Sequence, residues 1–373
     1  MWRTNTNRII LSVIEYMNRE LYKRLGGYIC EVDVRNRDLS VTTLLGVSIS
    51  KEFIPSIANT IGTDMSTYKI VRKGQFAYGP VTSRNGDKVS IALLANEDDA
   101  IISQAYTVFE VKDTNELLPE YLMMWFRRPE FDRYARFHSH GSAREIFDWS
   151  EMCDVMLPIP SIGRQKEIVA EYETLSKRIR LNEHMISSLE ATAQALYRKM
   201  FVDGIDKENL PDGWRIGTLE DIIEIRNGRA IITSDGSIPI YGGNGIVGYT
   251  SEYNAKDVVI IGRVGINCGS LFLHHGECFV NDNAMMSTSK SGHIGYFYLT
   301  LQQIDLNGQS EGSGQPLLTQ TIINKQPCII PSLNHIDEFE FQVQIIYNNR
   351  RILEKENNKL TELQSLLLAK MGQ

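Results

Sequence analysis

Residues 162–200 read IGRQKEIVAEYETLSKRIRLNEHMISSLEATAQALYRKM, and the architecture of the whole chain follows from them. Apolar and small residues recur here in steps of four and three, from Ile168 to Met200. This heptad spacing is typical of a helix that pairs with a second helix along one face. The residues assigned to helix pairing are Ile168, Tyr172, Leu175, Ile179, Ile186, Leu189 and Leu196.

A second copy of this pattern lies 171 residues further along the chain. Its residues assigned to helix pairing are Phe339, Val343, Ile346, Leu353, Leu360 and Leu367. The same offset relates Pro160 to Pro331 and Gly141 to Gly312, outside the helical stretches. Two unrelated amphipathic helices are the simpler alternative, but a constant offset over about sixty residues indicates an internal duplication.

The duplication predicts an α+β fold in which each half is a globular module followed by a long helix. We place the first module at 1–160, its helix at 161–203, the second module at 204–331 and its helix at 332–373. The two helices are expected to pair as an antiparallel coiled coil, with a pseudo-twofold relation between the halves. Polar residues within the pattern either fix the register of the pair or face solvent where the helix drifts off a 3.5-residue repeat. These residues are Asn182, Arg350, Asn357 and Gln364.

Composition is that of an ordinary globular protein, with 373 residues, 42% hydrophobic residues and a net charge of −7. No apolar run approaches the ~20 residues of a membrane span. Residues 1–25 are expected to form a helix that ends at Gly26-Gly27, and they lack the cleavage site of a secretory signal. We therefore expect a cytoplasmic protein whose five cysteines are reduced. The acidic charge counts against a free-standing nucleic-acid binder, but not against local basic faces.

Catalytic motifs are weak throughout the chain. Gly243 to Gly248 fit G-x-G-x-x-G, but the residues that follow predict a turn or a strand rather than the helix that a dinucleotide site needs. Cys268, His274, His275 and Cys278 lie within eleven residues, but they lack the paired ligand spacing of a zinc site. We expect no catalytic residues and no metal.

Polar side chains suited to nucleic acid cluster in each module instead. Arginine suits phosphates and guanine edges, whereas asparagine and glutamine suit adenine edges. The first module is rich in arginine and histidine and the second in amides, so the two would read different sequences. An ordinary solvated surface is the alternative. The candidate DNA-binding residues are Arg84, Asn85, Lys88, Arg136, His138, His140, Ser142, Arg144, Asn244, Arg263, Asn267, Asn281, Asn283, Gln309, Ser313 and Gln315.

The chain resembles the specificity subunit of type I restriction–modification systems over almost its whole length. The resemblance rests on LPDGW at 210–214, IPIYGGNGIVGY at 238–249, GSGQPLLTQTIINKQPCIIP at 312–331 and GRQKEIV at 163–169. Two departures stand out. The first module lacks the P-x-G-W opening, and Asn334-His335-Ile336-Asp337 replaces the usual Glu-Gln entry of the second helix.

The resemblance implies a non-catalytic subunit with two target-recognition domains that bind a bipartite, asymmetric sequence in double-stranded DNA. The paired helices would set the gap between the half-sites. It implies no cofactor in this chain, because two partner methyltransferase subunits would bind S-adenosylmethionine and methylate adenine at N6. Two motor-nuclease subunits would join for restriction. The alternatives are a coiled-coil scaffold without a direct DNA role, or an enzyme with a nucleotide or metal site near Gly243 or Cys268.

Overall fold

The structure is a computed structural model that describes residues 22–372, except 57–61, 84, 142–143, 232–234 and 313–315. The chain divides into two compact units. Residues 1–181 with 357–373 form the first unit, and residues 182–356 form the second. Each unit therefore contains one globular module together with half of each long helix. No helix in the described part of the chain is long and apolar enough to cross a membrane.

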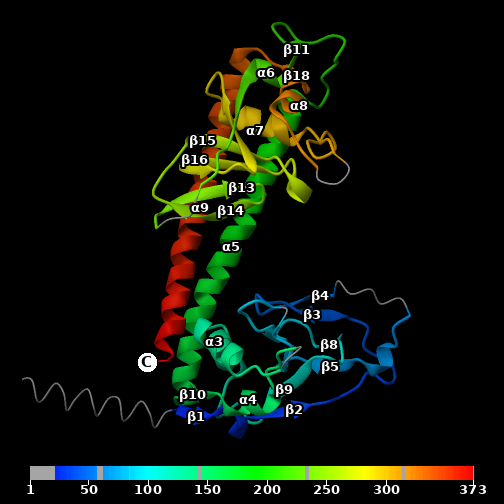
Figure 1. The fold of residues 1–373 in the computed structure, drawn as a ribbon, viewed down its shortest axis with the longest axis vertical. Coiled ribbons are helices and arrows are strands. Elements are labelled where there is room, and N and C mark those ends of the chain that lie inside the picture. Colours follow the sequence, from blue (N-terminus) through cyan, green and yellow to red (C-terminus); the bar gives the residue numbers. More distant parts are fainter. Residues whose placement is uncertain are drawn as a thin grey trace, which may run out of the picture. The chain divides into compact units, whose positions relative to one another are not determined.

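The first unit is built around a four-stranded sheet with the strand order β2-β9-β6-β7 (Figure 1). Two smaller antiparallel pairs, β3-β4 and β5-β8, share an apolar cluster with this sheet, and β1 pairs with β10. The strands are β1 Tyr22–Arg24, β2 Ile29–Val32, β3 Leu45–Val47, β4 Phe53–Pro55, β5 Lys69–Arg72, β6 Phe76–Tyr78, β7 Ile91–Leu93, β8 Asp99–Ile102, β9 Thr107–Val111 and β10 Met156–Pro158.

The described part of the first module contains three short α-helices, and an aromatic core joins them to the sheet. The helices are α2 Pro119–Phe126, α3 Pro129–Phe137 and α4 Trp149–Asp154. Proline stands at the first position of α2 and of α3, where its missing N–H costs nothing. Phe76 of β6 stacks on Phe109 of β9 and meets Phe126 of α2 edge-on. These rings are fully buried, so the core fixes α2 and α3 against the sheet.

The second unit contains a six-stranded sheet with the order β12-β17-β15-β16-β13-β14. Among its described strands, β13 and β16 pair in parallel and the other neighbours pair in antiparallel fashion. Its strands are β11 Arg215–Thr218, β12 Ile223–Asn227, β13 Ile238–Gly242, β14 Gly245–Thr250, β15 Ala255–Gly262, β16 Leu271–Val280, β17 Ala284–Ser289 and β18 Pro327–Ile330. Its short helices are α6 Leu219–Ile222, α7 Ile294–Gln302 and α8 Gln320–Asn324. The apolar helix α7 packs between this sheet and the long helices in one core.

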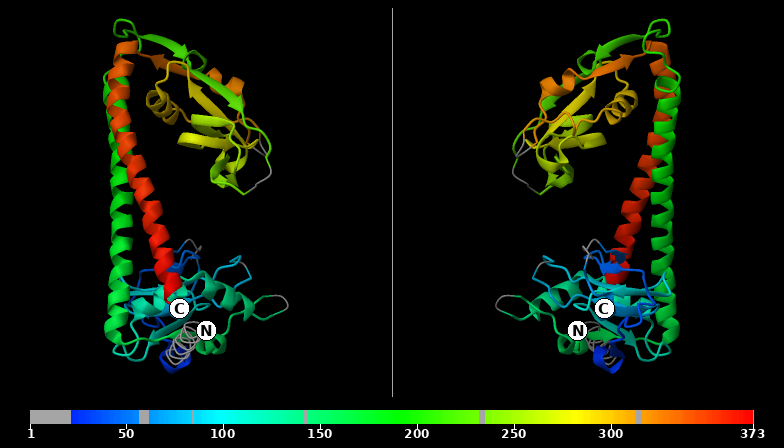
Figure 2. Two further views of the ribbon diagram at one scale, coloured as in Figure 1. Left: turned by 90° about the vertical axis from the view of Figure 1, so that its left-hand side faces the viewer. Right: turned by 90° about the vertical axis from the view of Figure 1, so that its right-hand side faces the viewer.

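The two long helices are α5 Ile162–Phe201 and α9 Leu333–Lys370, and they begin 171 residues apart. The short helices that precede them, α4 and α8, begin with the same offset. Each long helix follows a strand that pairs with an early strand of its own module: β10 with β1, and β18 with β11. In Figure 2, β11 and β18 are the green and orange strands that lie side by side next to the start of α9. The duplication that the sequence predicts is therefore present in the order of the elements.

The long helices pair in antiparallel fashion within each unit. In the first unit, Val169 and Tyr172 near the start of α5 share a buried cluster with Leu368 and Met371 at the chain end. Gln364 of α9 donates a hydrogen bond of 2.7 Å to the Ser176 hydroxyl of α5. In the second unit, Tyr197 and Phe201 at the end of α5 contact Phe339 near the start of α9.

The residues assigned to pairing all lie on buried or half-buried helix faces. Tyr172, Phe339, Val343 and Leu353 are buried, and the others are partly exposed. The structure adds neighbouring positions that the strict heptad omits, such as Val169, Tyr197 and Tyr347. Asn182 is wholly buried, and Arg350 and Gln364 have partners on the facing helix, so these polar residues lie within the pair.

The predicted helix over residues 1–25 is wrong in its described part. Residues 22–24 form β1, which pairs with β10 through Tyr22 and Pro158, and residues 25–27 form a short 3-10 helix. The Tyr22 hydroxyl also donates to the Gly372 carbonyl, and its ring meets Trp125. These tertiary contacts outweigh the local helix preference that the sequence indicates. Residues 1–21 lie outside the described residues.

Candidate nucleic-acid interface

The loops that the sequence analysis matched, HSHGSAR and NGQSEGSGQ, have the same backbone frame in the two units. In the first unit, His140 and Ile146 exchange both backbone hydrogen bonds, at 3.0 and 2.9 Å. The Phe147 amide donates to the Pro80 carbonyl, and the Thr82 amide donates to the Glu145 carbonyl. We call residues 136–146 with 80–88 the first tip.

The corresponding residues of the second unit make the same four bonds. Glu311 and Leu317 exchange backbone hydrogen bonds at 3.0 and 2.8 Å, the Leu318 amide donates to Arg263, and the Gly265 amide donates to Pro316. Residues 309–317 with 263–270, together with the adjoining residues 244 and 281–283, form the second tip. Glycine opens both loops with positive φ, 139° at Gly141 and 104° at Gly312. A Cβ atom on Gly141 would lie 2.1 Å from the Arg144 carbonyl oxygen, so only glycine fits there.

Side-chain bonds gather the predicted residues of the first tip. Arg136 donates to the Gly86 carbonyl at 3.2 Å and forms an ion pair of 3.2 Å with Glu145. His138 lies 2.9 Å from the carboxylate of Glu151 in α4. The predicted residues Asn85, Lys88, His140 and Arg144 lie on the same two segments. Arg136 is thus a brace between loops as well as a candidate contact.

A pocket of about 830 Å³ opens beside the first tip. Five cationic side chains line it against two acidic ones, Asp87 and Asp132. The cations are Lys51, Lys88, Arg127, Arg133 and Arg136, and Ile49, Ser50, Pro129 and Phe137 complete the wall. We call this the cationic pocket. A concave site with surplus positive charge suits a phosphodiester backbone, although the chain as a whole is acidic.

Lys51 has a structural role at the floor of the cationic pocket, because its charge is paired with that of Asp132. Its ammonium forms a buried ion pair of 2.7 Å with Asp132 and donates to the Phe126 carbonyl at the end of α2. Asp132 also accepts the Val89 amide at 3.0 Å. Burial lowers the pKa of Lys51, an effect that its bond to Asp132 opposes. The pair therefore ties α2, α3 and the segment before β7 together.

The predicted residues of the second tip fall into two neighbouring groups. The Arg263 amide donates to Asn283 at 3.1 Å, and the Asn283 amide donates to the Asn281 side chain at 2.9 Å. Asn244 is exposed at the turn between β13 and β14.

The second group surrounds Asn267, which ends a 3-10 helix. The carbonyl of the next residue, Cys268, accepts a hydrogen bond of 2.7 Å from the Asn307 side chain. Gln309 follows on that loop and is exposed.

Four predicted residues, Arg84, Ser142, Ser313 and Gln315, lie outside the described residues. The sequence analysis missed others that the fold brings to the tips. Lys51 comes from a loop far away in sequence, and no local motif marks it. Phe137 and Ile266 are 81% and 89% exposed at the first and second tips. The sequence feature that could have marked them is an apolar residue in a polar context: Phe137 at the end of a polar helix, and Ile266 between two glycine turns.

The structure places the residues of the alternative nucleotide and metal sites as follows. Residues 242–245 form the turn of the β13–β14 hairpin, and β14 continues to Thr250, so the glycines open no helix. Burial raises the pKa of Cys278 to about 12, which keeps its thiol protonated. In the part of the chain that the structure describes, no three His, Cys, Asp or Glu side chains are placed to hold a metal ion.

The α+β module that occurs twice, each copy with a polar tip, and the paired long helices place the chain in a class of two-module α+β proteins. The chain belongs to the family of the type I restriction modification DNA specificity domain, whose model matches residues 50–191 and 211–364. The two matched segments include one tip each.

Individual relatives are distant. The specificity subunit of the type I restriction enzyme HindI from Haemophilus influenzae is 26% identical over 36% of this chain and 29% of its own length. The EcoprrI specificity subunit from Escherichia coli is 25% identical over 47% of this chain and 46% of its own length. The chain thus spans less than half the length of these two curated relatives. The crystal structure of a type I restriction-modification S subunit from M. genitalium has the same fold, with a TM-score of 0.58, 16% identity and coverage of 94% of this chain and 95% of that one.

Proposed function

We propose that this chain is the DNA sequence-recognition subunit of a type I restriction–modification complex. Each tip would read one half of a bipartite, asymmetric target in double-stranded DNA, and the chain itself would catalyse nothing. Family membership and the duplicated tips support this proposal. A methyltransferase active on adenine N6 would supply the chemistry, with S-adenosylmethionine bound by two partner subunits, and motor-nuclease subunits would join for restriction.

The observation that carries the proposal is one backbone frame with two sets of side chains. Both tips make the same four main-chain hydrogen bonds, so the described residues that flank the two loops are held in the same way. The first tip offers guanidinium and imidazole groups, whereas the second offers Asn244, Asn267, Asn281, Asn283 and Gln309. Base edges are distinguished by their donors and acceptors, so unlike side chains on like frames suit two different half-sites.

The cationic pocket supports a second part of the proposal, contact with the phosphate backbone. Phosphate contacts position a protein on DNA and carry most of the salt dependence of binding. Arg133 is well exposed and Lys88 is exposed, so both can approach a phosphate. Arg127 is held partly by Tyr172 of α5, at 3.3 Å, and serves the wall of the pocket.

The test compares variants of the full chain, purified with the methyltransferase that its host encodes. The target is first identified by mapping N6-methyladenine in the host genome with and without this gene. Lys88→Ala and Arg133→Ala should each weaken binding to target and non-target DNA alike and reduce the salt slope by about one. Arg164→Ala, an exposed arginine of α5 paired with Glu167, is the matched control and should change neither.

Two outcomes would contradict the proposal. The methylation pattern would be the same without the gene, or the purified complex would bind all duplexes equally. Either result would favour the coiled-coil scaffold without a direct DNA role.

A further inference from the structure

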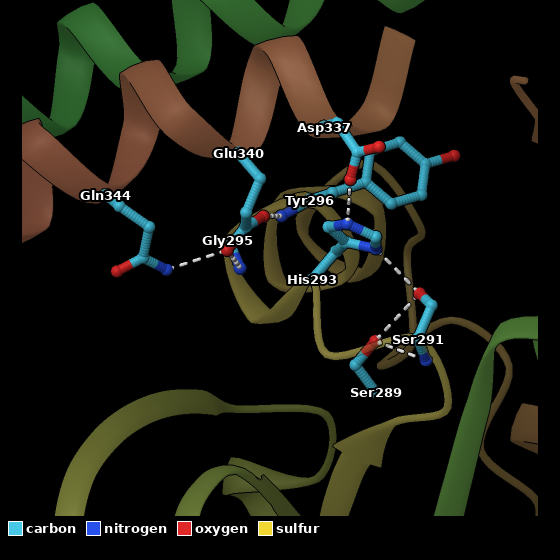
Figure 3. A network of polar contacts seen from close by, with 8 residues as sticks. All are labelled: Ser289, Ser291, His293, Gly295, Tyr296, Asp337, Glu340 and Gln344. Carbon is cyan, nitrogen blue, oxygen red and sulfur yellow. Dashed lines mark hydrogen bonds and ion pairs between the residues drawn. The ribbon is translucent and has the colours of Figure 1, made fainter. Parts of the chain in front are cut away.

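Glu340 of α9 holds the first turn of α7 in the second unit (Figure 3). Its two carboxylate oxygens accept the backbone amides of Gly295 and Tyr296, each at 2.9 Å. Gln344, one turn further along α9, donates to the same carboxylate at 2.7 Å. The amides at a helix start have no partner within the helix and carry partial positive charge. A carboxylate that accepts two of them therefore holds the helix start strongly and in one direction. We call such a contact, from a polar side chain of a long helix to the start of a short helix, a grip.

Burial makes this contact costly to lose. Glu340 is only 9% exposed, and the Cβ of a residue in place of Gly295 would lie 2.5 Å from Val343. The two helices thus approach closely at this point, with little room for water to replace the carboxylate. A buried acceptor that loses its donors, or donors that lose their acceptor, costs more than an exposed bond would contribute.

The first unit has a grip of the same kind made by another residue. Gln165 of α5 is fully buried, and its amide oxygen accepts the Leu118 amide, just before α2, at 2.9 Å. Its amide nitrogen donates to the Glu116 and Pro160 carbonyls, both at 2.8 Å. In each unit a polar side chain from the long helix therefore holds the start of the helix that covers the sheet.

The two grips sit one helical turn apart in the duplicated pattern. The residue that matches Gln165 under the 171-residue offset is Ile336, and the residue that matches Glu340 is Val169. Ile336 and Val169 are both buried in the apolar cores of their units. Polar and apolar positions have thus changed places between the halves. This accounts for the unusual entry Asn334-His335-Ile336-Asp337 of α9, where the glutamine is missing.

A chain of contacts leads from the grip to the second tip. His293, just before α7, lies 2.7 Å from Asp337 of α9 and 2.8 Å from the Ser291 hydroxyl. The Ser291 amide donates to Ser289, the last residue of β17 (Figure 3). The other end of β17 begins directly after Asn281 and Asn283 of the candidate interface. One six-residue strand, roughly 20 Å long, therefore joins the gripped segment to the tip side chains.

We propose that Glu340 is the positioning residue of the second module: by holding the start of α7 on α9 it sets the orientation of β17 and of the amides that read the second half-site. This inference rests on the proposed function. Gln165 has the same role in the first module, so the two half-sites depend on different residues.

The test uses the full chain with its methyltransferase and the mapped target. Duplexes with one substitution in either half-site are compared with the intact target. Glu340→Ala should reduce discrimination in one half-site by about tenfold and leave the other unchanged, and Gln165→Ala should do the reverse. The exposed Glu338→Ala is the matched control and should change neither half-site. The double variant Ile336→Gln with Glu340→Val, which copies the arrangement of the first unit, should restore discrimination.

Glu340→Gln serves if the alanine variant does not fold, because it keeps one acceptor and should give a smaller loss in the same half-site. Equal loss in both half-sites, or full discrimination in Glu340→Ala, would overturn the inference. Hydrogen exchange of the Gly295 and Tyr296 amides tests the role of Glu340 independently of the proposed function. Faster exchange in Glu340→Ala is expected even if the wild-type complex proves not to read sequence, and unchanged exchange would contradict the grip itself.

Discussion

Arg350 of α9 forms an ion pair with Glu190 of α5, with 3.2 Å between the guanidinium Nη1 and the carboxylate Oε1. Arg350 also pairs with Glu354 on its own helix at 2.8 Å. Burial lowers the pKa of Arg350, but the two carboxylates outweigh burial and the net pKa is raised. A permanent charge in a helix seam favours the register in which its partner lies opposite.

Glu190→Ala should lower the free energy of unfolding by about 0.5–1 kcal/mol, since the ion pair is only partly buried and Glu354 remains. Thermal unfolding of the full chain measures the change. Glu183→Ala, an exposed glutamate on the same helix, is the control. Equal effects of the two substitutions would show that the pair contributes nothing specific.

Lys51→Ala should be far more damaging, because it leaves the Asp132 carboxylate buried beside a single amide donor. Breaking one partner of a buried pair costs about 3–5 kcal/mol. Urea unfolding, followed by hydrogen exchange of the first unit, measures this loss. Lys51→Met combined with Asp132→Asn should recover much of it, because no buried charge is left alone. A single variant as stable as the wild type would contradict the role assigned to the pair.

Reversing charge in the cationic pocket should separate binding from folding. Arg133→Glu is expected to lower DNA affinity at least tenfold at low salt while leaving the melting temperature within about 2 °C, since Arg133 is exposed. Fluorescence anisotropy with a labelled duplex measures affinity. An unchanged affinity would remove the pocket from the interface.

The second unit should lose stability in mild acid through His274. Its Nδ1 lies 3.1 Å from the Tyr241 hydroxyl, and burial lowers its pKa. In the unfolded chain an imidazole titrates near 6.5, so the unfolded state binds the proton more tightly. The stability present above that pH is therefore lost progressively as the pH falls below about 6.5. His275, whose pKa burial also lowers, acts in the same direction.

His274→Gln should flatten this dependence of the free energy of unfolding on pH between 7 and 5. Urea unfolding at several pH values measures the slope. The exposed His184→Gln is the matched control and should leave the slope as in the wild type. A slope that His274→Gln does not change would assign the acid sensitivity elsewhere.

Much of the fold could be predicted because it repeats. The heptad pattern and the 171-residue offset predicted two long helices that begin at matching points, and the helices start at Ile162 and Leu333. The turn and strand around Gly243 were also predicted correctly, since no helix signal follows its glycines. The strand at residues 22–24 was missed because its partner, β10, lies more than 130 residues away and local propensity carries no trace of it.

The candidate interface could be predicted only where its residues lie close together in the sequence. Loop residues such as His138 and Asn267 stand out by type and spacing. Lys51 does not, because it lies in a turn with positive φ and reaches the pocket only through tertiary contacts. The missing glutamine of α9 was visible in the sequence. Its replacement by Glu340 was not, because the substitute lies at a position where the other half of the chain is apolar.

The four hydrogen bonds that the two tips share all join main-chain groups. Backbone hydrogen bonds impose no demand on the identity of the side chains that they present. The tips can therefore diverge by point substitution while the scaffold beneath them keeps its shape. Such an arrangement makes new recognition repertoires accessible by small evolutionary steps, provided that Gly141 and Gly312 are kept.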